Sequence, residues 1–299
     1  MRFVRAGKIE WPTLVVVAVC YAVWAVATTW LVTVSLPLAF VVTTLMVTLH
    51  SSVQHEVLHG HPFANRHLNE ALVFLPLGMV FPYGRFRDTH LEHHRDEHLT
   101  DPYDDPESNY LDPKVWAGLS WARRRLLRAN NALLGRMLFG PALSVWRFAR
   151  ADAAAIRAGD RAILRDWLLH FAGLVPVVWW VWQAPMPGWA YAIAAYAGFS
   201  LLKVRTFLEH RAHDLARGRS VIVEGQGIWS FLFLNNNFHY VHHSKPRAAW
   251  YELPAIYAAN REEWLKRNEG YRFASYGEGF RRYFLRAKDP VPHPLWPQE

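Results

Sequence analysis

Residues 11–34, WPTLVVVAVCYAVWAVATTWLVTV, form a run without a single charged side chain. At about 1.5 Å per residue, a helix of this length crosses the roughly 30 Å hydrocarbon core of a bilayer. A second apolar stretch, residues 36–58, follows directly, with only a break around Ser35 and Pro37. The two stretches therefore predict a tight helical hairpin that spans a membrane.

A second pair of apolar stretches lies further along the chain, at residues 163–183 and 189–209. The segment that joins them, Gln183–Gly188 (QAPMPG), carries no charge, and neither does the connection in the first pair. The sequence therefore predicts an all-α integral membrane protein with four transmembrane helices arranged as two hairpins. We expect residues 1–299 to form one membrane domain.

The distribution of basic residues supports this fold and predicts its orientation. The chain of 299 residues has a formal net charge of +8, yet no Lys or Arg lies between Lys8 and Arg66 or between Arg165 and Lys203. Two such gaps exclude a purely soluble globular domain. Because positive residues favour the cytoplasmic side, both termini and a helical cap formed by 63–162 and 211–299 are predicted to be cytoplasmic.

Composition also excludes some partners and modifications. A basic protein can bind nucleic acid, but a membrane protein has a simpler use for its positive charge, so we expect no nucleic-acid partner. The only cysteine, Cys20, lies inside the first apolar run, which excludes disulfide bonds.

Two segments of the predicted cap are informative. Residues 71–82 are apolar but too short to span a bilayer, so they predict a buried or interfacial helix. The acidic stretch 101–107, DPYDDPE, predicts a solvated loop punctuated by proline. Orientation of metal ligands and docking of a head group are the alternative roles for its carboxylates.

Histidines are grouped at helical spacing in three motifs: HEVLH (His55, His59), HLEHH (His90, His93, His94) and HYVHH (His239, His242, His243). Residues at i, i+3 and i+4 share one face of a helix, so each motif directs its imidazoles to one place. Imidazole is a good ligand for iron, zinc, copper and nickel.

The positions of these motifs predict a shared metal site. The first ends the second predicted span, the second opens the cytosolic segment, and the third follows the fourth span. His210 lies at the cytoplasmic end of that fourth span, so all four elements converge on one membrane–cytosol boundary. One metal takes about four to six ligands, so nine imidazoles indicate two metals.

At these residues the chain resembles the membrane fatty acid desaturase and hydroxylase superfamily, with two helical hairpins and three histidine boxes in order. The resemblance implies a non-haem di-iron centre at the cytosolic face, which uses O2 and two electrons to attack an unactivated C–H bond. It also implies that His210 is a ligand, since some members use a further histidine before the third box. Without a fused electron carrier, an external donor of ferredoxin or cytochrome b5 type is implied.

Desaturation of a fatty acyl chain drawn from the bilayer is the activity that the full set of boxes favours. The alternative within the family is a hydroxylase or ketolase that acts on an acyl lipid, a carotenoid or an alkane.

Several other residues are candidates for supporting roles. One of Asn235, Asn236 and Asn237 can hold a metal-bound water, as an Asn does in some relatives, although a turn or helix cap explains them equally well. His61 and Glu56 are candidates for the shell around the metal ligands. His50 with His55 would give a wider first box, but His55 and His59 lie nearer the cytosolic end of the span.

Two other classes of protein compete with this interpretation. HEVLH also matches the HExxH motif of zinc proteases, with Glu56 as the general base. That reading needs one metal and leaves both HxxHH motifs unused. A metal transporter would place ionisable residues near the middle of the bilayer, whereas these histidines gather at one interface.

Overall fold

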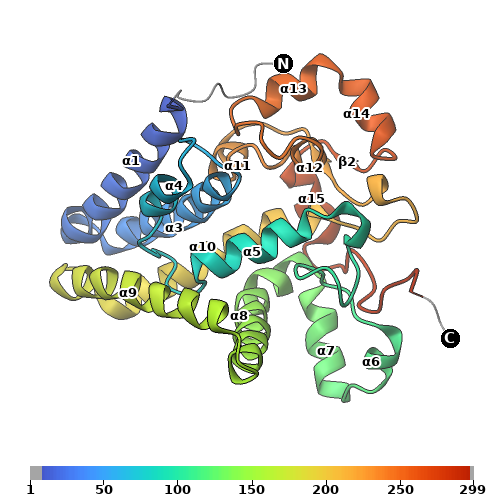
Figure 1. Ribbon diagram of the computed structural model, residues 1–299, viewed down its shortest axis with the longest axis horizontal. Helices are drawn as coiled ribbons and strands as arrows, with labels where there is room; N and C mark the ends of the chain where they lie inside the picture. The colour runs from blue at the N-terminus through green and yellow to red at the C-terminus, as the bar shows by residue number, and fades with distance from the viewer. Residues whose placement is uncertain (1–8, 297–299) are drawn as a thin grey trace. The chain divides into compact units, whose positions relative to one another are not determined.

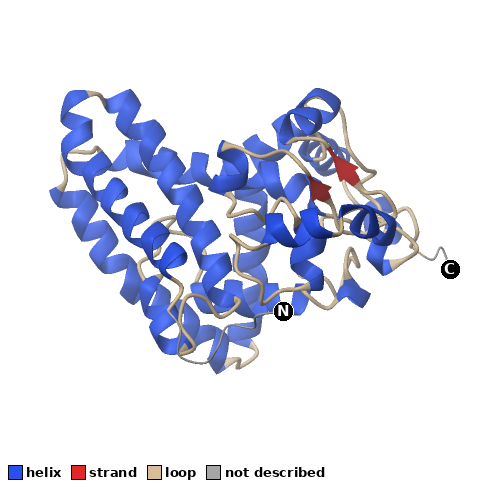
Figure 2. Ribbon diagram, turned by 90° about the horizontal axis from the view of Figure 1, so that it is seen from above, coloured by secondary structure: helices blue, strands red, loops and turns tan. Residues whose placement is uncertain are grey.

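The computed structural model describes residues 9–296, so the predicted cytoplasmic ends at 1–8 and 297–299 lie outside the described residues. Within that range the protein is mostly helical, as Figure 2 shows. In chain order the α-helices are α1 (Trp11–Val26), α2 (Val32–Val34), α3 (Leu36–Leu58), α4 (Arg66–Leu72), α5 (Tyr83–His93), α6 (Pro113–Ala117), α7 (Trp121–Asn130), α8 (Leu133–Arg157), α9 (Arg161–Gln183), α10 (Gly188–Glu209), α11 (Ile228–Leu232), α12 (His239–Ser244), α13 (Leu253–Ala259), α14 (Arg261–Arg267) and α15 (Tyr276–Tyr283). A π-helical turn (Ala27–Leu31) joins α1 to α2, two 3-10 turns span Asp96–His98 and Ala216–Gly218, and the strands are β1 (Ile222–Val223) and β2 (Arg272–Phe273).

Three of the four predicted membrane spans are confirmed as helices long and apolar enough to cross a bilayer. Within residues 9–296 they are Trp11–Val34, Leu36–Leu58 and Arg161–Gln183. The fourth predicted span forms the helix α10, but it is not among these candidates. Its Gly- and Ala-rich sequence and the charged residues in its last turns lower its hydropathy, so its crossing of the bilayer stays a prediction.

Contacts divide the chain into two compact units. The first unit comprises the residues up to Arg87 and Ser144–Phe199, and the second comprises Asp88–Leu143 and the residues from Ser200 onward. Each unit is described by itself below.

The first unit is built on the pair of helices α1 and α3, which lie side by side in Figure 1. Ser35 separates α2 from α3, and its Oγ accepts a hydrogen bond from the amide of Leu38 at 3.3 Å. In the core, the indole of Trp24 donates to the Tyr191 hydroxyl at 3.2 Å, and that hydroxyl donates to the Leu77 carbonyl at 2.8 Å. These bonds satisfy polar groups that apolar surroundings would otherwise penalise.

The apolar side chains that the first unit leaves exposed fit a surface that faces lipid. Trp30 is 63% exposed, Val175 67% and Trp182 83%, and all three belong to candidate spans. In water such large exposed side chains are unfavourable, whereas hydrocarbon or the membrane interface accommodates them.

The predicted helix over residues 71–82 is wrong beyond its first turn. Helix α4 ends at Leu72, and residues 73–82 form turns and bends. Pro76 and Pro82 lack an amide hydrogen for a helical bond, and Gly78 weakens helix formation further. Gly78 also lies so close to Phe199 that an added Cβ would come within 2.8 Å of its ring.

The second unit is organised around a small parallel sheet and the helix that carries the third histidine motif. β1 pairs with β2, with Ile222 opposite Arg272. Backbone bonds flank the sheet: the Tyr240 amide donates to the Val221 carbonyl and the Val223 amide to the Asn237 carbonyl, at 2.9 and 2.8 Å. Helix α12 is thereby fixed against β1, and the core there consists of Ile222, Phe238, Val241, Leu253, Tyr257 and Trp264.

Candidate metal centre

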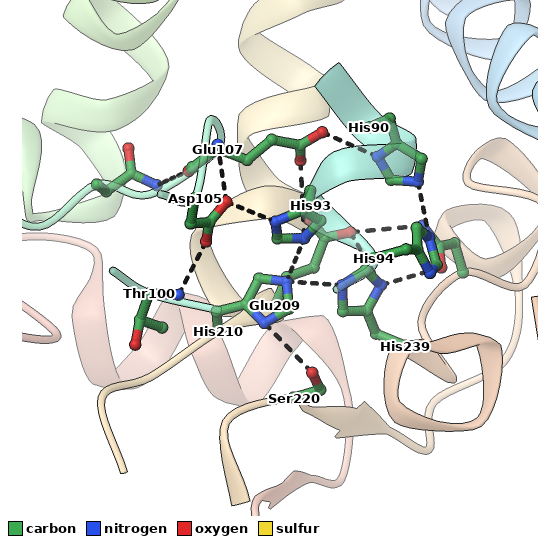
Figure 3. Close-up of polar contacts among 12 residues, drawn as sticks. His90, His93, His94, Thr100, Asp105, Glu107, Glu209, His210, Ser220 and His239 are labelled. Atoms are coloured by element: carbon green, nitrogen blue, oxygen red, sulfur yellow. Dashed lines mark hydrogen bonds and ion pairs between the residues drawn. The ribbon is translucent and has the colours of Figure 1, made fainter. Parts of the chain in front are cut away.

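Seven of the nine predicted ligands lie in the second unit, on three separate pieces of chain. Helix α5 and the residue after it supply one group, the residue after α10 supplies His210, and α12 supplies the third, as the labelled side chains of Figure 3 illustrate. The seven are His90, His93, His94, His210, His239, His242 and His243.

Four of these residues form one cluster, which we call the four-histidine cluster: His93, His210, His239 and His243. One ring nitrogen of each lies within 4.8 Å of the others. The Nε2 atom of His210 is 2.9 Å from Nε2 of His93 and 2.9 Å from Nε2 of His239. Four imidazole nitrogens at one point match the ligand number of a small metal ion.

The other three residues form a second group, the three-histidine group: His90, His94 and His242. Nε2 of His94 lies 3.0 Å from Nε2 of His90 and 3.1 Å from Nε2 of His242. His90 and His242 are buried, and His94 is half-buried. The second unit therefore presents two neighbouring sets of convergent imidazoles.

The contacts of Nδ1 indicate which ring nitrogen of His90 and His93 is the candidate ligand atom. Nδ1 of His93 lies 2.7 Å from Asp105, and Nδ1 of His90 lies 2.8 Å from Glu107. A carboxylate accepts this hydrogen bond, so each Nδ1 carries a proton, and the ring can coordinate a metal only through a deprotonated Nε2. Imidazole nitrogens that approach each other to about 3 Å are held by a shared proton or by a metal cation between them, so this geometry suits a metal site.

Asp105 organises the loop that supplies both carboxylates. One of its oxygens contacts His93 and accepts from the Glu107 amide at 2.9 Å, while the other accepts from the Thr100 amide at 2.8 Å. The prediction of a solvated loop over 101–107 is therefore wrong for Asp105, which is 5% exposed, although Asp104 is exposed. The alternative role, orientation of metal ligands, describes the contacts that Asp105 and Glu107 make.

Electrostatics favour the ionised form of Glu107 and the protonated form of His93. Burial raises the pKa of Glu107, but His93 and His90 outweigh burial and lower that pKa overall. Burial lowers the pKa of His93, but Glu107 and Asp105 outweigh it and raise the pKa to about 9. With this raised pKa, His93 carries a proton and a positive charge at neutral pH in the metal-free protein.

The other imidazoles are held neutral. Burial, reinforced by the charge on His93 and His243, lowers the pKa of His210 well below its usual value. Burial and the neighbouring His243 and His210 do the same to the pKa of His239. Neutral imidazole is the form that binds a metal, so these rings need no deprotonation.

The predicted asparagines separate into different roles. The Oδ1 atom of Asn236 lies 3.1 Å from Nδ1 of His239, so this side chain contacts a candidate ligand. Asn235 donates instead to the Trp250 carbonyl and Asn237 to the Val223 carbonyl. Of the three, Asn236 is the one that touches the four-histidine cluster.

Two further oxygens lie near the cluster, from Ser220, which was not predicted, and from Glu209, a candidate because it adjoins His210. The Ser220 hydroxyl lies 3.3 Å from Nδ1 of His210. Oε1 of Glu209 lies 3.5 Å from Nδ1 of His239 and 2.9 Å from Nε of Arg205, so the carboxylate is shared. The position of Glu209 immediately before His210 marks it as a candidate in the sequence. No feature of the sequence marks Ser220.

The first-box histidines lie in the first unit. His55 is in the last turn of α3 and His59 follows its end, with ring centroids 4.9 Å apart. The two rings are thus available as a pair, as the i, i+4 spacing predicts. His50 is engaged elsewhere, because its Nε2 lies 3.0 Å from the Tyr21 hydroxyl.

Glu56 and His61 lie together in a separate buried cluster of the first unit. Nδ1 of His61 is 2.7 Å from the carboxylate of Glu10, and its Nε2 is 3.8 Å from Glu56. Glu10, Glu56 and His61 also lie close enough to form a group of possible metal donors.

A comparison with protein families agrees with this arrangement. A family model described as fatty acid desaturase matches residues 28–275, which include every predicted ligand. The chain belongs to the fatty acid desaturase family. Among curated proteins, no similar sequence is found.

Membership of the fatty acid desaturase family makes this protein a lipid-modifying oxidoreductase of the membrane, as the resemblance implied. Members of this family generally contain two irons, and the histidine groups of this protein offer ligands that suit them. A stable metal site also requires hydrogen-bond acceptors for the ring nitrogens that do not bind the metal. Glu107 and Asp105 accept in this way from Nδ1 of His90 and His93.

Proposed function

We propose that this protein is an O2-dependent fatty acyl desaturase that inserts a double bond into an acyl chain at a di-iron centre. The observation that carries the proposal is the convergence of Nε2 atoms in the second unit, with Nδ1 of His90 and His93 held by carboxylates. Such a tautomer-locked, nitrogen-rich environment suits iron and leaves little reason for other uses of the same histidines.

In this proposal the four-histidine cluster holds one iron. The other is held by the three-histidine group together with His55 and His59 of the first box. The helical spacing of that pair and the ligand need of a second iron support its inclusion. Iron, when bound, supplies the activation of O2 and an oxidant strong enough for an unactivated C–H bond.

The protein's own contribution is to hold the ligands ready. Asp105 and Glu107 retain the protons of Nδ1 and fix the orientation of two rings. Burial keeps His210 and His239 neutral by lowering their pKa values, so they present lone pairs. Asn236 and Ser220 are placed to orient the outer nitrogens of His239 and His210.

The proposed setting is an integral membrane protein with the termini and the active site on the cytoplasmic side. The distribution of Lys and Arg supports this orientation. The acyl substrate enters from the bilayer, and the electrons come from an external carrier of ferredoxin or cytochrome b5 type.

Lipid analysis tests the reaction. The protein is expressed with a ferredoxin and its reductase in a host of known lipid composition, and the acyl chains are compared by mass spectrometry. Products lighter by two hydrogens support desaturation. Products heavier by one oxygen assign the protein to the hydroxylases, the alternative outcome within the family.

Metal analysis of the purified protein tests the cofactor. About two irons per chain agree with the proposal. A single zinc per chain would instead favour the HExxH protease interpretation, with Glu56 as its base.

A further inference from the structure

A basic pocket in the second unit is lined by Arg211, the residue that follows His210. It has a volume of about 250 Å³. Four cations but a single carboxylate line it, together with aromatic rings. The residues that matter below are Arg211, Tyr271, Arg272, Arg282, Lys288 and Asp289.

Arg211 is a fixed cation without an acidic partner. Its guanidinium donates to the backbone carbonyls of Gly218 and Glu269 at 3.0 and 3.2 Å, and lies 4.4 Å from the ring centroid of Tyr271. No carboxylate among residues 9–296 forms an ion pair with it. A guanidinium held in place this way loses little entropy when it binds an external carboxylate.

The rim of the pocket is also basic and accessible. The side chain of Arg282 is 58% exposed and that of Arg272 is 35% exposed, and each forms an ion pair with a glutamate. Both arginine side chains are accessible to solvent, so an incoming anion can compete with the glutamates for them. Arg281 and Arg286, on the same stretch of chain, are exposed as well.

The floor of the pocket touches the backbone of a proposed iron ligand. Nζ of Lys288 donates to the carbonyl of His210 at 2.5 Å and lies 3.2 Å from the Tyr271 hydroxyl. Asp289, the single acid of the lining, is 2.7 Å from the same Nζ and is thereby neutralised. The hydrogen bond from Lys288 to His210 therefore connects the pocket lining directly to a residue of the four-histidine cluster.

The proposed reaction needs electrons that this chain cannot store. Breaking two C–H bonds to form one C=C bond provides two electrons and two protons. Reduction of O2 to two waters takes four of each, so two electrons and two protons come from outside. With Cys20 as its only cysteine, the chain cannot ligate an iron–sulfur cluster by itself.

We infer that the basic pocket is the docking site for an acidic electron-carrier protein, with a carboxylate of the carrier inserted beside Arg211. This inference rests on the proposed function. Charge complementarity gives such a complex its speed and orientation, and the contact between Lys288 and His210 gives a short route from the docked carrier to the metal site.

The test uses the full-length, iron-loaded protein in nanodiscs of neutral lipid, with an acidic [2Fe–2S] ferredoxin as the probe. Binding is measured by calorimetry, and electron transfer by stopped-flow oxidation of the reduced ferredoxin. The variant is Arg272→Gln combined with Arg282→Gln. Glu224, the partner of Arg272, keeps Tyr257 and Arg261, so the fold should tolerate the change.

We expect roughly tenfold weaker ferredoxin binding in the double variant at low salt, with a smaller dependence on ionic strength than in the wild type. Reduction by dithionite, which needs no docking, should be unchanged. Arg267→Gln is the matched control, because Arg267 is 57% exposed and its ion pair with Glu263 lies outside the pocket. The control should bind ferredoxin as the wild type does.

Equal ferredoxin binding by the double variant and the wild type would overturn the inference. So would saturable binding of pyrophosphate that the variant loses while ferredoxin binding persists, since the pocket would then be a small phosphate site. A wild type that dithionite fails to reduce would contradict the proposed function alone, because ferredoxin binding is measured independently of iron chemistry.

Discussion

Replacement of Asp105 by asparagine should separate metal binding from folding more cleanly than any change to a ligand. The carboxylate of Asp105 lies 2.7 Å from Nδ1 of His93, 2.8 Å from the Thr100 amide and 2.9 Å from the Glu107 amide. Asparagine has nearly the same shape but only one acceptor oxygen. At least one of these donors therefore loses its partner or faces an amide hydrogen.

The expected loss of metal affinity follows from these contacts. A hydrogen bond to a charged group contributes about 1.5–3 kcal/mol, and removal of a partner from the outer nitrogen of a ligating histidine weakens metal binding by about 10–100-fold. Because Asp105 also helps raise the pKa of His93, the variant's His93 should be less basic as well. We expect the variant to lose at least one iron under conditions in which the wild type retains both.

Competition with a chromogenic iron chelator measures the affinity, and elemental analysis after dialysis measures the iron that remains. Asp104→Asn is the matched control, since Asp104 is the exposed neighbour in the same loop. Thermal unfolding of both metal-free variants reports any general damage. Wild-type iron affinity in Asp105→Asn, or equal losses in the two variants, would refute the argument.

Other expected outcomes concern the ligands, the pH dependence and the packing of the first unit. His94→Ala should abolish turnover and leave membrane insertion intact, as activity and fractionation assays would reveal; residual activity would contradict its role. In the metal-free protein, the raised pKa of His93 stabilises the fold fully below its usual value near 6.5 and this contribution is lost as the pH rises through about 9. Iron must displace that proton, so at neutral pH we expect about one proton released per chain from His93, measured by calorimetry in buffers of different ionisation enthalpy, and an affinity that increases up to about pH 9. Gly198→Leu should destabilise the protein by about 1–3 kcal/mol in thermal unfolding, because an added Cβ would lie 2.7 Å from Val47, whereas Gly188→Ala meets open space and should have little effect.

The proximity of the histidines within each motif was predictable because helical spacing alone brings i, i+3 and i+4 onto one face. His90, His93 and His94 are close together on and just after α5, and their counterparts share α12, as the spacing indicated. The assignment of His93 and His90 to different groups was not predictable. It depends on how α5 is rotated against α12, which only tertiary packing determines.

The carboxylates that support the ligands were harder to recognise. Asp104 and Asp105 are adjacent and chemically identical, yet one is exposed and the other is buried against His93. A loop has no period from which to infer the direction of a side chain, so composition favoured solvent for both. The run of acids shortly after the second motif was the available signal, and it did not distinguish between them.

The membrane helices show the same division between local and tertiary information. Uninterrupted apolar runs predicted α1, α3 and α9, because length and hydropathy are properties of the segment itself. Residues 73–82 do not form the predicted helix, because Pro76, Gly78 and Pro82 disfavour helical structure. The average apolar content of a segment does not reveal such single residues.

The contacts of Asp105 have a consequence for how the centre can change. This side chain orients His93 in the four-histidine cluster and, through the Glu107 amide, also fixes the residue that orients His90 in the other group. Both proposed metal positions are therefore linked to one side chain, Asp105. Mutations in this loop should alter the filling of the two positions together, so a chain with one position improved at the expense of the other should not arise from changes here.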